Sequence, residues 1–549
     1  MSFRILVCRI LLLAMLTGST ARPTFGRDRA EATLQRRHQN FLEQRSTILE
    51  NLKYELGQIS DWCDENGLPQ AADEVRQLSL DLTSDDSVTW PPRLVALAIQ
   101  PTLEQRERQW RMQVLKMRTD RAMELYSLAR KALTNAGLPS LAYRLIQDVL
   151  RVNPDHVHAR AILGQEKFLD PLRNEDSSYA GEWVSPYESL RRRGRIPHIL
   201  HEQYGWMPRA HVVRYEQGMR PWKGGWHSRQ KDEEIRRDFR HGWEVESEHF
   251  LVRTNVSLED GVVLSRHLET YHQWLRQNFA AFFDTSAALK KRFQRASVRD
   301  RRRALPRTQM EVWYFATRDG YQRMVRGKVP PGIETNGLYW QPDKRCYFFR
   351  NTDYPSLDTL FHEATHQILD IPTRRARVTA ARALARKARK ARKPLQEWIL
   401  GGQSNFWIIE GLACYFESFD VQDGLISVGR PDHIRIVAAQ HRLLRDDFYI
   451  PLETFCGLGK DQFQHHANVR QLYSQASGVV HFLMHYEEGR YRDDLVRLLT
   501  SVYRPDSRNP ELQVTLSNVT GVPFRELDRQ YREHMEHLAQ PSNAVLFSQ

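Results

Sequence analysis

The sequence predicts an α+β protein in which mostly α-helical N-terminal modules precede a domain that combines a small sheet with helices. Apolar residues recur at helical spacing up to about residue 170. Short alternating segments typical of strands follow between residues 248 and 349, and helical patterns then return. At 549 residues the chain is too long for one ordinary domain, so roughly two to four domains are expected.

The composition favours folded domains and excludes a disordered chain. Hydrophobic residues make up 41% of the sequence and aromatic residues 10%, which is enough for packed cores. The formal net charge of +13 would suit an anionic partner. Because no nucleic-acid-binding motif accompanies this charge, we interpret it as a surface property and expect no nucleic-acid partner.

Residues 1–21 have the pattern of a secretory signal peptide. Arg4 supplies the positive start, residues 10–16 form an apolar run, and Ser19-Thr20-Ala21 resembles a small-residue cleavage site. The apolar run is too short to span a bilayer, and no later stretch predicts a transmembrane segment. We therefore expect a secreted or periplasmic protein of the cell envelope.

The cysteines predict neither a disulfide framework nor a zinc cluster. Loss of the signal would remove Cys8 and leave Cys63, Cys346, Cys414 and Cys456, whose number and spacing suit neither. We expect Cys414 to be a small buried residue. A bridge between some pair stays open as an alternative in an oxidising compartment.

Residues 22–100 are expected to form a helical region. A helix over 28–67 has an apolar stripe, and Gly67-Leu68-Pro69 ends it before a second short helix that runs through Leu80. The stripe consists of Leu34, Phe41, Leu49, Leu52 and Leu56.

Residues 101–170 resemble a tetratricopeptide-like (TPR-like) helical hairpin. Two helices flank a turn at 135–139, and an Asn153-Pro154-Asp155 junction leads into a further helix. Two interpretations are open: a docking module for a protein partner, and a helical prodomain or extension that packs on its neighbour.

Residues 171–245 form an aromatic-rich linker module. The segment is rich in Trp, Tyr, Pro and Gly, which predicts short, irregular elements between two larger bodies. Its aromatic side chains could bind sugar or could fasten the linker to its neighbours, and both interpretations are open.

The domain over residues 246–549 begins with alternating strands and helices. Strands are expected at 249–256, 310–315, 336–340 and 345–349, the last two as a hairpin, and helices at 258–283 and 321–325. A small sheet is therefore expected before the first motif whose residues could bind a metal or catalyse a reaction.

The segment Phe361-His362-Glu363-Ala364-Thr365-His366-Gln367 is that motif. On a helix, His362 and His366 lie one turn apart on the same face and can share one Zn²⁺. Glu363 lies about 100° round the helix, beside the metal, where a carboxylate can take a proton from water. Taken alone, the motif is also compatible with surface histidines that have no chemical role.

A second apolar helix, which contains Glu410, strengthens the interpretation as a metal site. An unpaired carboxylate inside a hydrophobic run would be costly, so a metal or an arginine is expected as its partner. The small residues Gly411 and Ala413 would let this helix approach the first one closely. We predict a zinc site of His362, His366 and Glu410 with its fourth position open, as in catalytic sites.

These motifs resemble the gluzincin clan of zinc metallopeptidases. FHEATHQ, WIIEGLACYFE and the later Tyr473-Ser474-Gln475-Ala476 with His481-Phe482-Leu483 are similar to the DUF1570 family of secreted bacterial proteins. The resemblance runs from about Glu248 to the C-terminus. It implies a zincin-like fold, a zinc cofactor and a peptide or protein substrate, which the edge strand of the sheet would bind through its backbone.

The resemblance also implies roles for individual residues. Glu363 would act as general base and then acid, and Tyr473 lies where related enzymes place a residue that stabilises the oxyanion. Packing of its own helix is the alternative role of Tyr473, and His481 and His485 are weaker candidates for the oxyanion.

The sequence does not decide which residues orient the proposed zinc histidines. Related enzymes carry an aspartate four residues after the third ligand, where this chain has Cys414. Asp370 and Glu417 are the candidates for this role.

A basic insertion is expected at 373–400, between the two site helices. Asp370-Ile371-Pro372 should end the first helix, and arginine and lysine then alternate with alanine. This pattern is typical of a solvated helix or loop, with a basic rim that selects acidic substrates as the alternative. After Glu417 the chain is expected to be helical to its end.

We therefore expect an exported zinc-dependent metallopeptidase-like protein. The alternative is a non-catalytic binding or scaffold protein that uses the helical module and has a structural or vestigial zinc site. The intact Glu363 favours the enzyme, because a purely structural site needs no base at that position.

Overall fold

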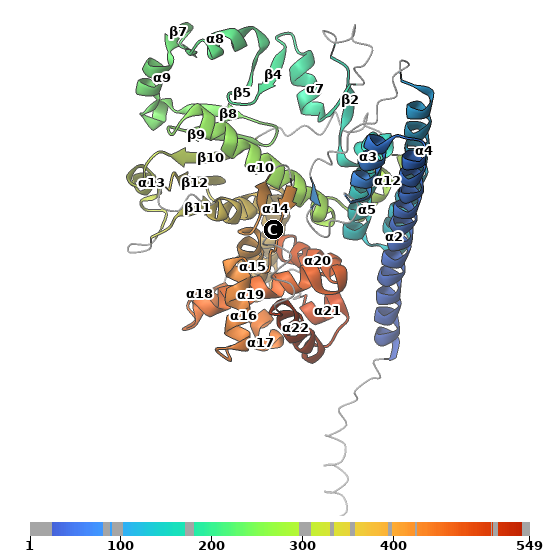
Figure 1. Ribbon diagram of the computed structural model, residues 1–549. Helices are drawn as coiled ribbons and strands as arrows, with labels where there is room; N and C mark the ends of the chain where they lie inside the picture. Colours follow the sequence, from blue (N-terminus) through green and yellow to red (C-terminus); the bar gives the residue numbers. More distant parts are fainter. Residues whose placement is uncertain are drawn as a thin grey trace, which may run out of the picture.

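The computed structural model describes residues 25–80, 88–89, 103–170, 181–295, 309–329, 334–351, 357–392, 398–422, 425–506, 508 and 514–540. The predicted signal at 1–21 lies outside these residues. The fold is α+β, mainly helical with a small mixed sheet, as predicted (Figure 1). None of the described helices combines the length and the apolarity that a membrane crossing requires.

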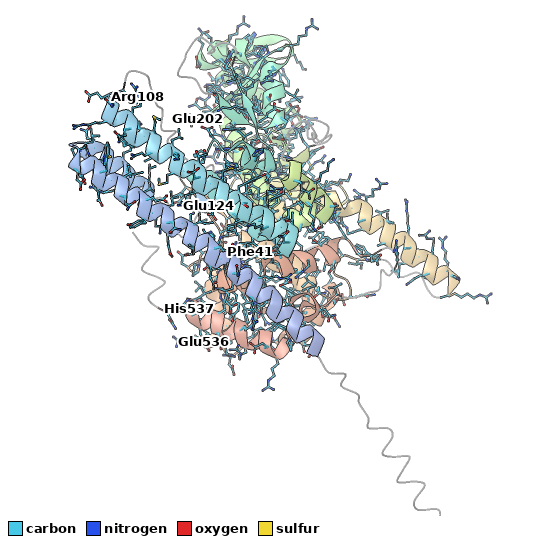
Figure 2. The ribbon with its side chains drawn as sticks, turned by 90° about the vertical axis from the view of Figure 1, so that its right-hand side faces the viewer. Phe41, Arg108, Glu124, Glu202, Glu536 and His537 are labelled. Carbon is cyan, nitrogen blue, oxygen red and sulfur yellow. The ribbon has the colours of Figure 1, made fainter. Side chains whose placement is uncertain are left out.

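The N-terminal residues form a helical layer along one side of the molecule (Figures 1 and 2). Its elements are α2 (Phe25–Glu65), α3 (Pro69–Leu80), α4 (Gln105–Lys131), a π-helical turn (Ala132–Ala136), α5 (Pro139–Val152) and α6 (Val157–Leu163). The predicted helices are confirmed. Leu49, Leu52 and Leu56 of the expected stripe are buried against this layer's own core.

The helical hairpin of α4 and α5 does not continue into further repeats. The short α6 ends at Gly164, and strand β2 (Glu166–Phe168) follows at once. The hairpin packs on the rest of the protein: the Ser140 amide donates to Asp493 (3.0 Å), and Arg292 donates to the Tyr143 hydroxyl (2.7 Å). These contacts are those of a packing extension.

The linker module consists of short elements, as its composition predicts. They are β3 (Glu182–Val184), α7 (Pro186–Arg193), the hairpin of β4 (His198–His201) and β5 (Gly205–Pro208), α8 (Val212–Glu216), the hairpin of β6 (Met219–Trp222) and β7 (Gly225–Ser228), and α9 (Arg229–Arg236).

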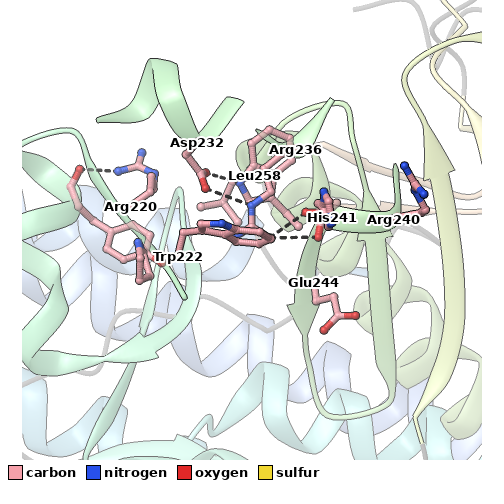
Figure 3. Close-up of a pocket in the computed structure, with 12 residues that line it drawn as sticks. Arg220, Trp222, Asp232, Arg236, Arg240, His241, Glu244 and Leu258 are labelled. Carbon is pink, nitrogen blue, oxygen red and sulfur yellow. Dashed lines mark hydrogen bonds and ion pairs between the residues drawn. The ribbon is translucent and has the colours of Figure 1, made fainter. Parts of the chain in front are cut away.

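Charged and aromatic side chains fasten this linker to the sheet around a hollow of about 380 Å³ (Figure 3). Asp232 is buried and accepts hydrogen bonds from the Trp243 indole (2.9 Å) and from Arg236 (3.1 Å). The Arg236 guanidinium lies 4.6 Å from the centre of the Trp222 ring. Because these groups satisfy one another, the contacts around this hollow support the fastening role over sugar binding.

The five-stranded sheet has the order β11-β12-β10-β9-β8. Its strands are β8 (Trp243–Glu246), β9 (Phe250–Thr254), β10 (Met310–Phe315), β11 (Gly337–Trp340) and β12 (Arg345–Phe349). The central pairs are parallel, and both outer pairs are antiparallel. The predicted strands and hairpin are confirmed, and β8 spans the expected domain boundary at 245/246.

Helices connect and cover the sheet. Those between its strands are α10 (Leu258–Asn278), α11 (Ala280–Phe283), α12 (Ser286–Arg295) and α13 (Arg318–Val325). The C-terminal body then contains α14 (Asp358–Lys390), α15 (Phe406–Phe416), α16 (Ile434–Leu444), α17 (Leu452–Gly457), α18 (Lys460–Gln464), α19 (Val469–His485), α20 (Arg492–Tyr503), α21 (Leu516–Thr520) and α22 (Phe524–Leu538).

The expectation that the chain is helical throughout after Glu417 is wrong. β13 (Asp420–Gln422) and β14 (Leu425–Ser427) form an antiparallel pair, and β14 also pairs with β1 (Val88–Thr89). Strands of two or three residues carry no periodic pattern, and the partner of β14 lies far away in the sequence. The cysteine alternative is also resolved, because Cys63, Cys346, Cys414 and Cys456 are all free and buried.

The expectation that Pro372 ends the helix of the first motif is also wrong. α14 continues through Pro372 and includes much of the basic stretch, whose residues 393–397 lie outside the description. Proline removes one backbone donor, but side chains bind the neighbouring carbonyls. The Thr373 hydroxyl donates to Leu369 O (2.7 Å), and Arg377 donates to Asp370 O (3.2 Å).

The end of α14 projects from the body as a basic helix (Figure 2). Most of its arginines and lysines are exposed, whereas Arg377, Ala380 and Ala383 are buried. The Arg377 guanidinium forms an ion pair with the Asp370 carboxylate, and both side chains are at most 5% exposed.

Arg377→Ala should destabilise the protein, because it leaves the buried Asp370 carboxylate without its cation. Removal of one partner of a buried ion pair typically costs about 3–5 kcal/mol. Denaturant unfolding of the two proteins measures this difference. The exposed Arg386→Ala is the control and should change the free energy of unfolding by less than about 0.5 kcal/mol. Equal effects of both substitutions would contradict the prediction.

Candidate metal centre

The candidate site lies where α14 and α15 pack together at the centre of the C-terminal body. α14 contributes His362, Glu363 and His366, and the almost entirely buried α15 contributes Glu410. Gly411 serves a different contact from the one expected. A Cβ atom there would lie 2.6 Å from the Ala476 carbonyl oxygen, so this glycine admits α19 rather than α14.

His362, His366 and Glu410 converge as predicted. The Nε2 atoms of His362 and His366 lie 3.7 Å and 3.9 Å from the same Glu410 oxygen, Oε2. Donors around a tetrahedral zinc with bonds of 2.0–2.1 Å lie about 3.3 Å apart, so a small contraction would complete the coordination. The side chains are 13–17% exposed, which keeps one side of the group accessible. This donor set fits zinc and leaves a fourth position open.

Glu417 orients His362. Its Oε1 atom accepts a hydrogen bond from His362 Nδ1 (2.9 Å), and Arg435 donates to both carboxylate oxygens (2.6 Å and 2.8 Å). With the proton on Nδ1, the Nε2 lone pair of His362 faces Glu410. Of the two candidates for this role, Glu417 therefore fills it. Arg435 carries no local sequence signal and was missed.

Asp370 has another role. Its carboxylate accepts hydrogen bonds from the Tyr339 hydroxyl (2.8 Å) and Gln341 (2.8 Å), in addition to Arg377. Tyr339 and Gln341 lie in or directly after β11, so Asp370 joins α14 to the edge of the sheet.

Glu363 points toward the edge of the sheet rather than toward the three donors. Its Oε2 atom accepts a hydrogen bond from the backbone amide of Tyr339 in β11 (2.7 Å). Because β11 is the edge strand, this amide has no strand partner on that side. The contact fixes the carboxylate beside the donors, which is the position expected of a base.

Tyr473 lies at the site, whereas His481 and His485 do not. The Tyr473 hydroxyl on α19 hydrogen-bonds to Glu410, and its pKa is raised by burial and by the negative charge of Glu410. His481 is bonded to His534 (2.9 Å) and to Gly429 O (2.9 Å). His485 is bonded to the Tyr415 hydroxyl (2.7 Å).

The charges of the site favour an ionised Glu410 and a neutral His366. Burial opposes the charged form of His362, but Cys414, Glu410 and Glu417 raise its pKa well above the usual value, so a metal would displace a proton from this ring. Burial opposes ionisation of Glu410, but the adjacent His362 and the positive charges nearby lower its pKa to about 2. Burial lowers the pKa of His366, which favours the neutral imidazole. An ionised carboxylate and a neutral imidazole are the forms that donate to a metal.

Glu417→Gln should weaken zinc binding without removing a ligand. The amide is a poorer acceptor for His362 Nδ1–H, and loss of such an orienting partner typically lowers metal affinity by about 10–100-fold. Glu410→Gln, which removes a proposed ligand, should weaken it further. Competition with a chelator of known affinity measures both. Unchanged affinity in Glu410→Gln would show that the third ligand is misassigned.

Comparisons with known protein families and with curated proteins find no match to this chain. The interpretation of the site therefore rests on its residues and their geometry.

Proposed function

We propose that this protein is an exported zinc-dependent peptidase of the gluzincin type. One observation carries the proposal: two imidazole nitrogens lie 3.7 Å and 3.9 Å from one oxygen of a buried carboxylate. A largely buried carboxylate that faces two imidazoles in this arrangement is suited to a cation as their common partner. Three protein donors with an accessible fourth position are the arrangement of catalytic rather than structural zinc.

Each residue around the proposed zinc has a distinct task. Zinc held by His362, His366 and Glu410 would supply the Lewis acidity that activates water and polarises a peptide carbonyl. Glu363, fixed through Oε2 by the Tyr339 amide, takes a proton from the water with its other oxygen. The same carboxyl group then gives a proton to the leaving nitrogen.

Tyr473 would stabilise the negative charge that develops on the carbonyl oxygen. Its raised pKa keeps the phenol protonated, so it can donate a hydrogen bond at neutral pH. To do so, the hydroxyl would exchange its contact with Glu410 for one with the substrate. An extended peptide would lie along β11, the edge strand beside Glu363.

The Glu363→Gln variant distinguishes the enzyme hypothesis from the scaffold hypothesis. The variant keeps all three proposed ligands, so it should bind zinc and melt like the parent. Peptide hydrolysis should fall by about 10²–10⁴-fold, the usual contribution of a general base. Zinc content, melting temperature and turnover on a broad peptide library are compared side by side. Glu453→Gln on the exposed face of α17 is the matched control and should keep full activity.

Two outcomes would count against the proposal. Equal hydrolysis by Glu363→Gln and the parent would remove Glu363 from the mechanism. Absence of hydrolysis by the zinc-loaded parent on every peptide would favour the scaffold, in which the helical layer binds a protein partner.

A further inference from the structure

A second group of potential metal donors lies outside the site described above. His249, Glu269 and His272 each offer a donor atom, and these three atoms lie within 4.8 Å of one another. His249 immediately precedes β9, while Glu269 and His272 lie one turn apart on α10. The neighbouring Tyr271 instead faces α14, where its hydroxyl shares a hydrogen bond with Thr365 (2.5 Å). The group is therefore on a different face of α10 from the candidate metal centre.

His272 is the most deeply buried of these three residues. It is only 6% exposed, and its ring nitrogens form no hydrogen bond with any residue that the structure describes. Its ring lies against that of His249, with 3.9 Å between the ring centres. His272 also lines a cavity from which a ligand could reach its ring nitrogens.

Glu269 and His249 supply the other two donors. The carboxylate accepts hydrogen bonds from the His249 amide (2.6 Å) and from His249 Nδ1 (2.8 Å). A metal would take the place of the Nδ1 proton, so that His249 Nδ1 and Glu269 Oε2 both donate to it. The hydrogen bond from the His249 amide to Glu269 Oε1 would remain and hold the carboxylate in place.

The group opens into a cavity of about 570 Å³ whose lining includes all three residues. The cavity lies between the sheet, the linker module and the N-terminal helical layer, since Val245, Trp183 and Tyr143 also line it. Water can therefore reach the group and complete the coordination of a bound ion.

We propose that His249, Glu269 and His272 form a second binding site for a divalent transition metal, with zinc as the expected ion. Two imidazoles and one carboxylate suit zinc and the neighbouring first-row metals rather than magnesium or calcium. Binding would adjust the donors, which now lie within 4.8 Å of one another, to separations of about 3.3 Å, which side-chain rotation can accomplish. A bound ion would join the start of β9 to α10.

Zinc stoichiometry by equilibrium dialysis of the full-length chain tests this site independently of catalysis. The parent should bind about two zinc ions, and a double variant His362→Ala, His366→Ala should bind about one. Addition of His272→Ala to that double variant should abolish binding. His267→Ala, on the same helix but outside the group, is the matched control and should leave the remaining ion in place.

The outcomes distinguish this site from the candidate metal centre. No zinc in His362→Ala, His366→Ala, or one zinc that survives His272→Ala, would overturn the second site. A parent that loses its only zinc through His272→Ala would support the second site and contradict the first. Glu269→Gln, which keeps the size of the side chain, provides the same test where His272→Ala lowers the melting temperature.

Discussion

Glu410 places a charged carboxylate inside α15, a helix that is otherwise almost wholly apolar and buried, and the surrounding structure compensates that charge. His362 and His366 face it from α14, and the Tyr473 hydroxyl approaches it from α19. Burial of a single carboxylate in an apolar core would be strongly unfavourable without such partners. The Glu410 carboxylate can therefore be buried only where α14, α15 and α19 pack together.

Hydrogen bonds from α14 connect this centre to the sheet. Near its start, Glu363 binds the Tyr339 amide of the edge strand, and two turns later Asp370 binds the Tyr339 hydroxyl. Arg377, on the next turns, neutralises Asp370 and helps the helix to pass Pro372. One residue of β11 is thus held at both its backbone and its side chain. This arrangement fixes Glu363 relative to His362, His366 and Glu410, as the proposed proton transfer would require.

The N-terminal layer is part of the same body. Contacts from α5 reach α20 through Ser140 and Asp493, and reach the segment after α11 through Tyr143 and Arg292. The cavity beside His249, Glu269 and His272 lies at this junction. A metal bound there would therefore connect the sheet to its covering helix at the place where the helical layer meets them.

The amino-acid sequence by itself determined the helices of the N-terminal layer, the hairpin of β11 and β12, and the selection of His362, His366 and Glu410 as a group of potential donors that lie together. Each depends on local periodicity, on turn residues or on a charged group in an apolar run, and these signals are contained in a few neighbouring residues. The local rule failed at Pro372, where α14 continues. Thr373 and Arg377 bind the carbonyls of Leu369 and Asp370, and the Arg377 guanidinium also lies 5.8 Å from the centre of the Tyr503 ring of α20, a contact with a distant part of the chain.

Only the tertiary structure decided which partners the donors have. Glu417 was one of two candidates for orienting His362, and its selection depends on the packing of α14 against α15 and on Arg435 from α16. The pairing of β14 with β1 joins residues more than three hundred positions apart in the sequence. The burial of His272 follows from the packing of α10 beneath the linker and the helical layer. Contacts between distant residues leave no periodic trace in the chain, so folding alone reveals them.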